Sequence, residues 1–241
     1  MDSSGLSSRE LPRWDSSGLT CEGVPVATHR LWRPYTSLAN AVRQADRIAH
    51  RQVQPGPLQQ HQHGWAAAYE RLRQLIVDAV PDQAVVIDHV GSTAVTGLSA
   101  KPVIDVDLTV PDATDELAYV PRLEAVGFRL IFRDDIGGDV HRQLTFAAPN
   151  ANLHVWSPGA VEPQRHAMFI SWLRTHPADR DRYAAAKRAA TDEMGGLRYN
   201  DSKSAVVYDI YERAFTADSA HVHDPQPRPC ACASNASDDA P

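Results

Sequence analysis

The sequence predicts an α+β fold, in which a mixed sheet flanked by helices is followed by a C-terminal helical bundle. Two apolar runs, Ala84 to Val90 and Val103 to Val110, have the length and composition of buried strands. A helical pattern precedes them, and three further helical stretches follow Pro158. Strands grouped ahead of a run of helices are typical of this fold class.

The flanks are expected to lie outside the folded domain. The first 30 residues are rich in Ser and Gly without a sustained period, and the chain after Ala217 is polar and Pro-rich. Residues 38–53 have the pattern of a helix, which the following Pro- and Gly-containing segment breaks. We therefore divide the chain into a disordered extension (1–36), a helix and linker (37–63), a folded domain (64–216) and a disordered tail (217–241).

The folded domain is expected to begin with an α/β part over residues 64–158. Its first helix ends before Pro81, and its apolar residues recur at spacings of three and four: Trp65, Tyr69, Leu72, Leu75, Ile76 and Ala79. A short helix is expected after Ser92 and a longer one from Glu116 to Val126. The other expected elements are strands at Phe128–Phe132, Leu144–Ala147 and Asn152–Trp156, and a turn over Asp134–Asp139.

The helical part of the domain is expected over residues 159–216. Pro177 and the pair Gly195-Gly196 divide it into three helices. These helices are predicted at Pro163–His176, Ala178–Met194 and Ser202–Phe215.

Composition restricts the functions open to this chain. Its 241 residues carry a net charge of −6, which argues against a dedicated nucleic-acid binder. No apolar run approaches the roughly 18–20 residues that span a bilayer, and no secretion signal is visible at the N-terminus. We expect a cytoplasmic protein with no membrane partner. The oligomeric state is left open.

The cysteines suggest neither a disulfide framework nor a closed zinc site, because all three lie in the flanks. Cys230 and Cys232, with His221 and His223 nearby, fit no standard structural zinc pattern. We expect these residues to lie in the disordered tail.

The turn Gly91-Ser92 directly follows the first apolar run. A strand that ends in Gly-Ser and opens a helix offers backbone N–H groups to a phosphate. Serine is also a preferred helix N-cap, so the same residue can serve structure alone. Together with the two aspartates that follow, the turn is expected to hold the β- and γ-phosphates of a triphosphate.

Asp105 and Asp107 lie two positions apart in the second apolar run, so both point to one face of the expected strand. Carboxylates in such apolar surroundings are costly unless a cation lies between them. We expect both to be catalytic and to bind Mg²⁺ or Mn²⁺. The alternative is a solvent-facing strand with alternating polar residues.

Further candidates surround these two motifs. His154, on a short strand, could act as a metal ligand or general base in place of a third carboxylate, or be a hydrogen-bonded structural histidine. His89 could orient the turn, and Lys101 could reach a phosphate or remain solvated. Weaker candidates for a third carboxylate are Asp88, Asp134 and Asp135.

These motifs resemble those of the GrpB family of predicted nucleotidyltransferases. The segment His89–Val110 carries the family's His-Val-Gly-Ser-Thr and Ala-Lys-Pro-Val-Ile-Asp elements. The likeness covers about residues 64–216, because it continues in Leu153–Val155, Phe169–Pro177, Tyr183–Lys187 and Tyr199–Lys203. Thr96, Asn152 and the tripeptide Ile170-Ser171-Trp172 depart from the family pattern.

The resemblance implies the fold of the polymerase-β-like nucleotidyltransferases, which use a Gly-Ser turn and an Asp-x-Asp strand and commonly add a third carboxylate. The residues then expected to bind nucleotide are Gly91, Ser92, Thr93, Lys101 and Lys203. The helices after Pro158 would shape an acceptor pocket, whose candidate residues are Arg142, Trp172, Arg174 and Lys187.

We therefore expect a Mg²⁺-dependent nucleotidyltransferase that moves NMP from an NTP, with ATP as the expected triphosphate, to a small-molecule acceptor. One form of this reaction would activate a carboxylate for later amide formation. The alternative is a non-catalytic nucleotide-binding or scaffolding module, similar to the domain fused to some dephospho-CoA kinases. The acidic net charge disfavours nucleic acid as the acceptor.

Overall fold

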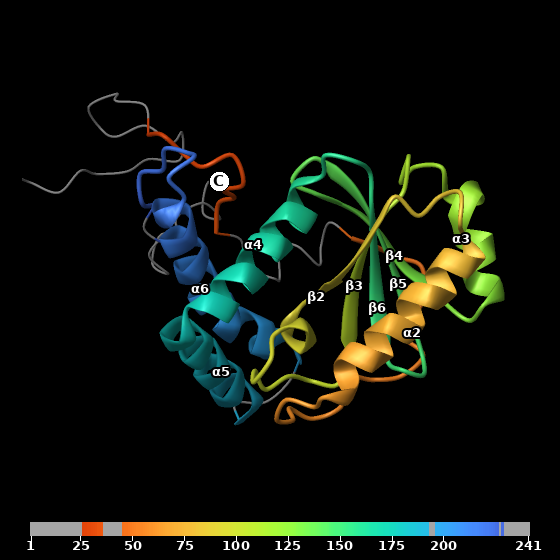
Figure 1. The fold of residues 1–241 in the computed structure, drawn as a ribbon, viewed down its shortest axis with the longest axis horizontal. Coiled ribbons are helices and arrows are strands. Elements are labelled where there is room, and N and C mark those ends of the chain that lie inside the picture. Colours follow the sequence, from red (N-terminus) through yellow and green to blue (C-terminus); the bar gives the residue numbers. More distant parts are fainter. Residues whose placement is uncertain (1–25, 36–44, 193–195, 227, 229–241) are drawn as a thin grey trace, which may run out of the picture.

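A six-stranded mixed sheet with helices on both sides forms the computed structural model, which describes residues 26–35, 45–192, 196–226 and 228 (Figure 1). The strands lie in the order β1-β4-β5-β6-β3-β2. Their bounds are β1 Asp46–Arg47, β2 Val86–Val90, β3 Ile104–Thr109, β4 Arg129–Ile136, β5 Asp139–Phe146 and β6 Ala151–Trp156. Only β3 and β6 pair in parallel within the described sheet. The predicted α+β fold is confirmed.

Two helices cover one face of the sheet, and three more form a bundle on the other side (Figure 1). The first pair is α2 (Gly64–Ala79) and α3 (Glu116–Ala125); the bundle consists of α4 (Val161–Thr175), α5 (Pro177–Asp192) and α6 (Gly196–Ala217). Helices were predicted at all five places, although α6 begins earlier than the expected Ser202. The short helix after Ser92 is a single 3₁₀ turn, η1 (Ser92–Ala94).

The main hydrophobic core lies between the sheet and helices α2 and α3. Ile104, Val106 and Leu108 of β3 are buried there, together with Leu72 and Ile76 of α2. Successive residues of a strand point to opposite faces. The intervening aspartates of β3 therefore point away from this core, toward the bundle.

The segment from residue 45 to residue 59, here the crossing segment, differs from the helix predicted over 38–53. It contains β1 and no helix, while residues 36–44 lie outside the described part of the chain. The backbone N–H of Ile48 bonds to the carbonyl of Ile131, 2.9 Å away. Pairing with the edge of β4 thus overrides the local helical pattern, as tertiary contacts often do.

Parts of both flanks pack on α6, contrary to the expected disorder over 1–36 and 217–241. Leu31 is buried against Tyr211 and Phe215. His223 is also buried, and its Nε2 lies 2.9 Å from the Glu212 carboxylate. Isolated apolar residues in a polar sequence gave no period that could reveal these contacts. The remaining domain boundaries stay predictions.

Two strand predictions need correction. The turn expected over Asp134–Asp139 is confined to Gly137-Gly138, whose φ angles of 63° and 92° suit a tight hairpin between longer strands. The strand after Ala84 was expected to be buried, but β2 is an edge strand and only its last residue, Val90, is buried. In the described residues, none of the helices has the length and apolar character needed to cross a membrane.

Candidate functional site

The polar face of the sheet gathers four side chains of β3 and β6. The parallel register places Asp105 beside Asn152 and Asp107 beside His154. Asn152 donates a hydrogen bond of 2.6 Å to Asp105, and His154 Nε2 lies 4.0 Å from the same carboxylate oxygen. The structure thus brings the two predicted aspartates and the predicted histidine together.

Gly91 lies directly against the carboxylate of Asp105. Its φ of 69° is a conformation that favours glycine, and a Cβ atom added there would lie 2.3 Å from Asp105 Oδ2. The next residue, Ser92, opens η1 and lies with its Oγ 3.5 Å from the hydroxyl of Tyr183. The Gly-Ser turn and the Asp-x-Asp strand therefore form one continuous site.

Asp105 is held in its charged form. Burial disfavours the carboxylate, but the interaction with His154 and the hydrogen bond from Asn152 outweigh it and keep the pKa of Asp105 below its usual value. A deprotonated carboxylate beside a serine hydroxyl has the hard oxygen chemistry that Mg²⁺ prefers. Asp105 therefore fits the role of a metal ligand.

Asp107 is bound more fully by the protein itself. It is buried, and its two oxygens accept hydrogen bonds from Trp156 Nε1 at 3.1 Å and from His166 Nδ1 at 2.7 Å. Burial opposes both charges, yet this contact lowers the pKa of Asp107 and raises that of His166. Asp107 can offer a metal only its remaining lone pairs, so a metal here would depend mainly on Asp105.

The three weaker carboxylate candidates have separate positions. Asp88 lies opposite Asp107 across β2 and β3, whereas Asp134 bonds to His141 Nδ1 at 2.6 Å. Asp135 accepts the backbone N–H of Gly138 in the hairpin turn. Of the three, Asp88 alone is a register neighbour of an Asp-x-Asp carboxylate.

A cavity of about 660 Å³ opens beside this site and is called the basic cavity here. It contains five cationic side chains and one carboxylate: Arg47, Arg51, Lys101, Lys187, Lys203 and Asp105. Its wall also includes Ser92, Phe132, Gln143 and Asn152. Such an excess of positive charge in a concave site attracts polyanions.

A second cavity of about 360 Å³ shares Ser92, Asp105 and Lys203 with the first. It lies against the bundle and is lined by Phe169, Tyr183 and Tyr211, with Arg165 and His166. We call it the aromatic cavity. Asp105 therefore lies where a hollow rich in cations meets one rich in aromatic rings.

Lys187 is a buried lysine in the wall of the basic cavity. Its Nζ donates to the carbonyl of Ser99 and lies 4.6 Å from the ring centre of Tyr183. Burial, with the nearby charges of Lys203 and Arg188, lowers the pKa of Lys187 to about 7. An anion in the cavity would therefore favour proton uptake by this amine.

Several residues that the sequence did not single out support the site. His141 Nε2 lies 3.0 Å from His154 Nδ1, so Asp134, His141 and His154 form a hydrogen-bonded row. His166 comes from α4, and Arg51 comes from the crossing segment. A strand expected from Asp139 instead of Leu144 would have indicated His141 by its alternation, whereas nothing local indicated His166 or Arg51.

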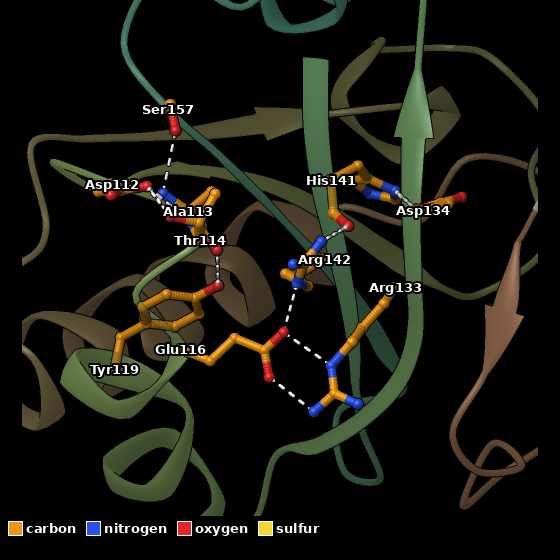
Figure 2. A network of polar contacts seen from close by, with 10 residues as sticks. All are labelled: Asp112, Ala113, Thr114, Glu116, Tyr119, Arg133, Asp134, His141, Arg142 and Ser157. Carbon is orange, nitrogen blue, oxygen red and sulfur yellow. Dashed lines mark hydrogen bonds and ion pairs between the residues drawn. The ribbon is translucent and has the colours of Figure 1, made fainter. Parts of the chain in front are cut away.

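Arg142 does not belong to the site, contrary to the prediction. It alternates with His141 and lies on the opposite face of β5, where its Nε is 2.5 Å from Glu116 (Figure 2). Arg133 binds the same carboxylate through two hydrogen bonds of 2.7 Å. Arg142 and the buried Leu144 are two positions apart on β5, so they lie on the same face of the sheet, which is covered by α3.

Three other candidates also serve the surroundings of the site. Thr93 is buried and its Oγ1 lies 2.9 Å from His89 Nε2, so this contact connects the turn to β2. Arg174 donates to the carbonyl of Ala94 and thereby fixes η1 to α4. Trp172 donates to Asp179 and stacks on His176, away from both cavities. These contacts within the protein account for the three side chains, and their expected contacts with ligands stay predictions.

The replacement Arg142→Gln is expected to lower the free energy of unfolding by about 1 kcal/mol, because Glu116 keeps Arg133 as a partner. Triphosphate affinity should not change, since Arg142 lies on the other face of the sheet. Urea denaturation and calorimetric titration measure the two quantities. A tenfold loss of triphosphate affinity in a folded variant would contradict this placement.

Histidines from both flanks, His29, His221 and His223, form hydrogen bonds to carboxylates. His29 Nε2 and His221 Nδ1 both lie about 3 Å from Asp218, and this trio has metal-ligand spacing. The backbone N–H of Leu31 donates to His29 Nδ1, which favours the tautomer in which Nε2 donates to Asp218, so the contacts are those of a hydrogen-bonded trio. Cys230 and Cys232 lie outside the described residues.

The site thus consists of a Gly-Ser turn packed against an Asp-x-Asp strand in an α+β fold, and it opens into a cationic cavity. The chain belongs to the GrpB family: the family model described as GrpB protein matches residues 57–213. This confirms the resemblance seen in the sequence. The match excludes Arg47 and Arg51.

Similar proteins agree with this assignment. UPF0157 protein BH1888 of Halalkalibacterium halodurans is 41% identical over 154 residues, which cover 62% of this chain and 77% of that protein. A dephospho-CoA kinase of Mycolicibacterium paratuberculosis is 32% identical over 202 residues, 73% of this chain and 48% of the kinase. The crystal structure of conserved protein GrpB from Enterococcus faecalis has the same fold, with a TM-score of 0.57 at 22% identity, over 66% of this chain and 98% of that one.

Proposed function

We propose that this chain is a Mg²⁺- or Mn²⁺-dependent nucleotidyltransferase that acts on a small-molecule acceptor, with ATP as its triphosphate. The observation that carries the proposal is the position of Asp105. This charged carboxylate lies against the Gly-Ser turn, at the junction of a cationic and an aromatic cavity. A cation, a triphosphate and a nucleoside each find matching chemistry there.

The nucleoside would occupy the aromatic cavity, since bases stack on rings such as Phe169 and Tyr183. The Ser92 turn and the lysines Lys101, Lys187 and Lys203 would bind the phosphates. When bound with Asp105, the cation would neutralise charge on the triphosphate and lower the pKa of an attacking hydroxyl. This assignment moves Lys187 from the predicted acceptor pocket to the phosphates.

In the reaction, an acceptor oxygen or nitrogen would attack the α-phosphorus in line. A bond forms from that atom to phosphorus, the bond to the bridging oxygen breaks, and pyrophosphate leaves with the bonding electrons. The acceptor proton would pass to His154, beside Asp105. Asn152 and the row formed by Asp134 and His141 would orient the two groups. Positioning and charge neutralisation would supply most of the rate.

One observation favours a second candidate function, a nucleotide-binding module without turnover. Both oxygens of Asp107 already accept protein hydrogen bonds, and a histidine stands where a third carboxylate is commonly found. The match to half of a dephospho-CoA kinase is compatible with a module fused to another enzyme.

Isotope transfer distinguishes the two candidates. The protein is incubated with Mg²⁺, a bacterial small-molecule extract and ATP labelled at either the α- or the γ-phosphorus. A transferase puts the α-label into a new product and the γ-label into pyrophosphate. Transfer of the γ-label would identify a kinase instead, and triphosphate binding without any transfer would support the module.

Triphosphate binding at pH 8 is expected to take up about one proton, because the anion restores the charge of Lys187. Calorimetric titrations in two buffers with different ionisation enthalpies measure this uptake. The variant Lys187→Met should bind more weakly and lose most of the uptake. Equal uptake by the variant and the wild type would remove Lys187 from the phosphate site.

The lowered pKa of Lys187 also predicts how the stability of the unliganded protein depends on pH, which gives a control without triphosphate. Its pKa lies below the unfolded value, so between about pH 7 and 10.5 the unfolded chain binds a proton that the folded chain has lost. The contribution of Lys187 to stability therefore rises with pH across this window. Lys187→Met should flatten this rise in urea denaturation.

A further inference from the structure

The crossing segment covers one end of the basic cavity with residues that precede the family match. Strand β1 pairs with β4 at the edge of the sheet, and Gln59 pairs with Ala100 at the other end of the segment. In between, Arg47, Arg51 and Gln54 reach the cavity wall. The cavity is therefore completed by residues 45–56, which lie outside the GrpB match at 57–213.

Arg51 is fixed in place by oxygen atoms of neutral groups. Its Nη1 donates to Asn152 Oδ1, its Nη2 donates to Asn150 Oδ1 at 2.8 Å, and its Nε donates to the carbonyl of Val53 at 3.2 Å. Within the described residues, no carboxylate lies within ion-pair distance of this guanidinium. A guanidinium has five N–H donors, and these three hydrogen bonds use three of them, so two can donate to a ligand.

A half-buried guanidinium without a carboxylate partner is poorly compensated. Burial lowers the pKa of Arg51, and the charge of Asp105 offsets only part of that effect. Arg47 adds a second positive charge and lies 4.5 Å over the ring of Phe132. An oxyanion bound here would restore the balance, and guanidinium groups bind carboxylates and phosphates in a bidentate manner.

The order of the strands separates two ends of the basic cavity. The arginine end contains Arg47 and Arg51, and the lysine end contains Lys101, Lys187 and Lys203. Arg47 lies on β1 beyond β4, and Arg51 reaches β6, whereas the Gly-Ser turn follows β2 on the other side of Asp105. The hydrogen bonds from Arg51 to Asn152 and from Asn152 to Asp105 connect the two ends. A triphosphate at the lysines would leave the arginine end for a second anion.

We propose that Arg51, assisted by Arg47, binds an oxyanion group, a carboxylate or a phosphate, carried by the acceptor. The acceptor is then an anionic small molecule whose charged group is held on the far side of Asp105 from the triphosphate. That the anion belongs to an acceptor rests on the proposed function. The anion site itself can be tested without nucleotide.

The test follows the side-chain amide NMR signals of Asn152 and Gln143 in the full-length ¹⁵N-labelled protein. Succinate and methyl phosphate are titrated separately, with sodium chloride at matched ionic strength as the reference. We expect saturable changes in chemical shift with at least one of the two anions. The anion that binds more tightly identifies the chemical group that the site prefers. The shifts should persist when a Mg²⁺-bound, non-hydrolysable ATP analogue is present.

Variants separate binding by Arg51 from general electrostatics. Arg51→Gln should lower the affinity for the anion at least about tenfold. Arg51→Lys should have an intermediate affinity, because lysine keeps the positive charge but cannot bind an oxyanion in a bidentate manner. Arg71→Gln, an exposed arginine of α2, removes the same charge elsewhere and should have no effect. The dispersion of each spectrum reports whether the variant is folded.

Two results would overturn the proposal. One is anion binding that Arg51→Gln leaves unchanged, and the other is displacement of the anion by the ATP analogue together with an equal loss of analogue affinity in Arg51→Gln. The second result would assign Arg51 to the triphosphate. If no triphosphate binds but the anion still requires Arg51, the transferase proposal fails and the anion site stands.

Discussion

Asp105→Asn is expected to reduce transfer of the α-label by about 100- to 1,000-fold, the range typical for loss of one charged group aimed at a reacting phosphoryl. Asparagine has nearly the same shape but no charge to hold a cation. Its side-chain oxygen can still accept the hydrogen bond from Asn152, so the free energy of unfolding should change by less than about 1 kcal/mol. The isotope assay and urea denaturation measure both quantities.

Asp107→Asn is the matched control on the same strand. An asparagine amide has one oxygen, so it cannot accept from both Trp156 and His166 in the way that the carboxylate does. We expect a loss of about 1–3 kcal/mol in stability, because a buried donor is left unsatisfied. Full activity in Asp105→Asn, combined with inactivity in a stable Asp107→Asn, would reverse the roles assigned to the two aspartates.

Gly91→Ala is the second large effect that we expect. The backbone of Gly91, with φ 69° and ψ −169°, lies in a region that is almost exclusive to glycine and costs an alanine about 1–3 kcal/mol. A Cβ 2.3 Å from Asp105 Oδ2 adds a clash that must displace the carboxylate. The total should be about 3 kcal/mol, with overpacking supplying the remainder. Activity should fall about as far as in Asp105→Asn.

Gly97→Ala isolates the backbone part of this effect. Gly97 has a φ of 80°, but a Cβ there would meet no atom within 4 Å. This variant should lose only about 1–2 kcal/mol of unfolding free energy and keep its activity at low temperature. Equal losses of stability and activity in both variants would show that the close approach to Asp105 has no special importance.

The sequence was sufficient for elements with a clear internal period. Helix α2 and strand β3 each carry an apolar pattern that specifies both the element and its buried face. The core of the site was predictable for a related reason. Gly91, Ser92, Asp105 and Asp107 lie within a single short segment, so no long-range pairing had to be guessed.

Contacts between distant segments could not be read from periodicity. His166 reaches Asp107 from α4, and Arg51 reaches Asn152 from the crossing segment, which the local pattern assigned to a helix. Strand pairing and register depend on partners elsewhere in the chain. Arg142 was misplaced because the expected strand began at Leu144, whereas β5 begins at Asp139 and its alternation turns Arg142 toward Glu116.

We propose above that Asp105 and the adjoining turn form a metal-dependent triphosphate site. Calorimetric titration of the wild type and of Asp105→Asn with ATP, CTP, GTP and UTP, each with and without Mg²⁺, tests it most directly. We expect at least one triphosphate to bind in a way that requires Mg²⁺, and this binding to be lost in the folded variant. Absence of triphosphate binding by the wild type, or Mg²⁺-dependent binding that Asp105→Asn retains in full, would contradict it.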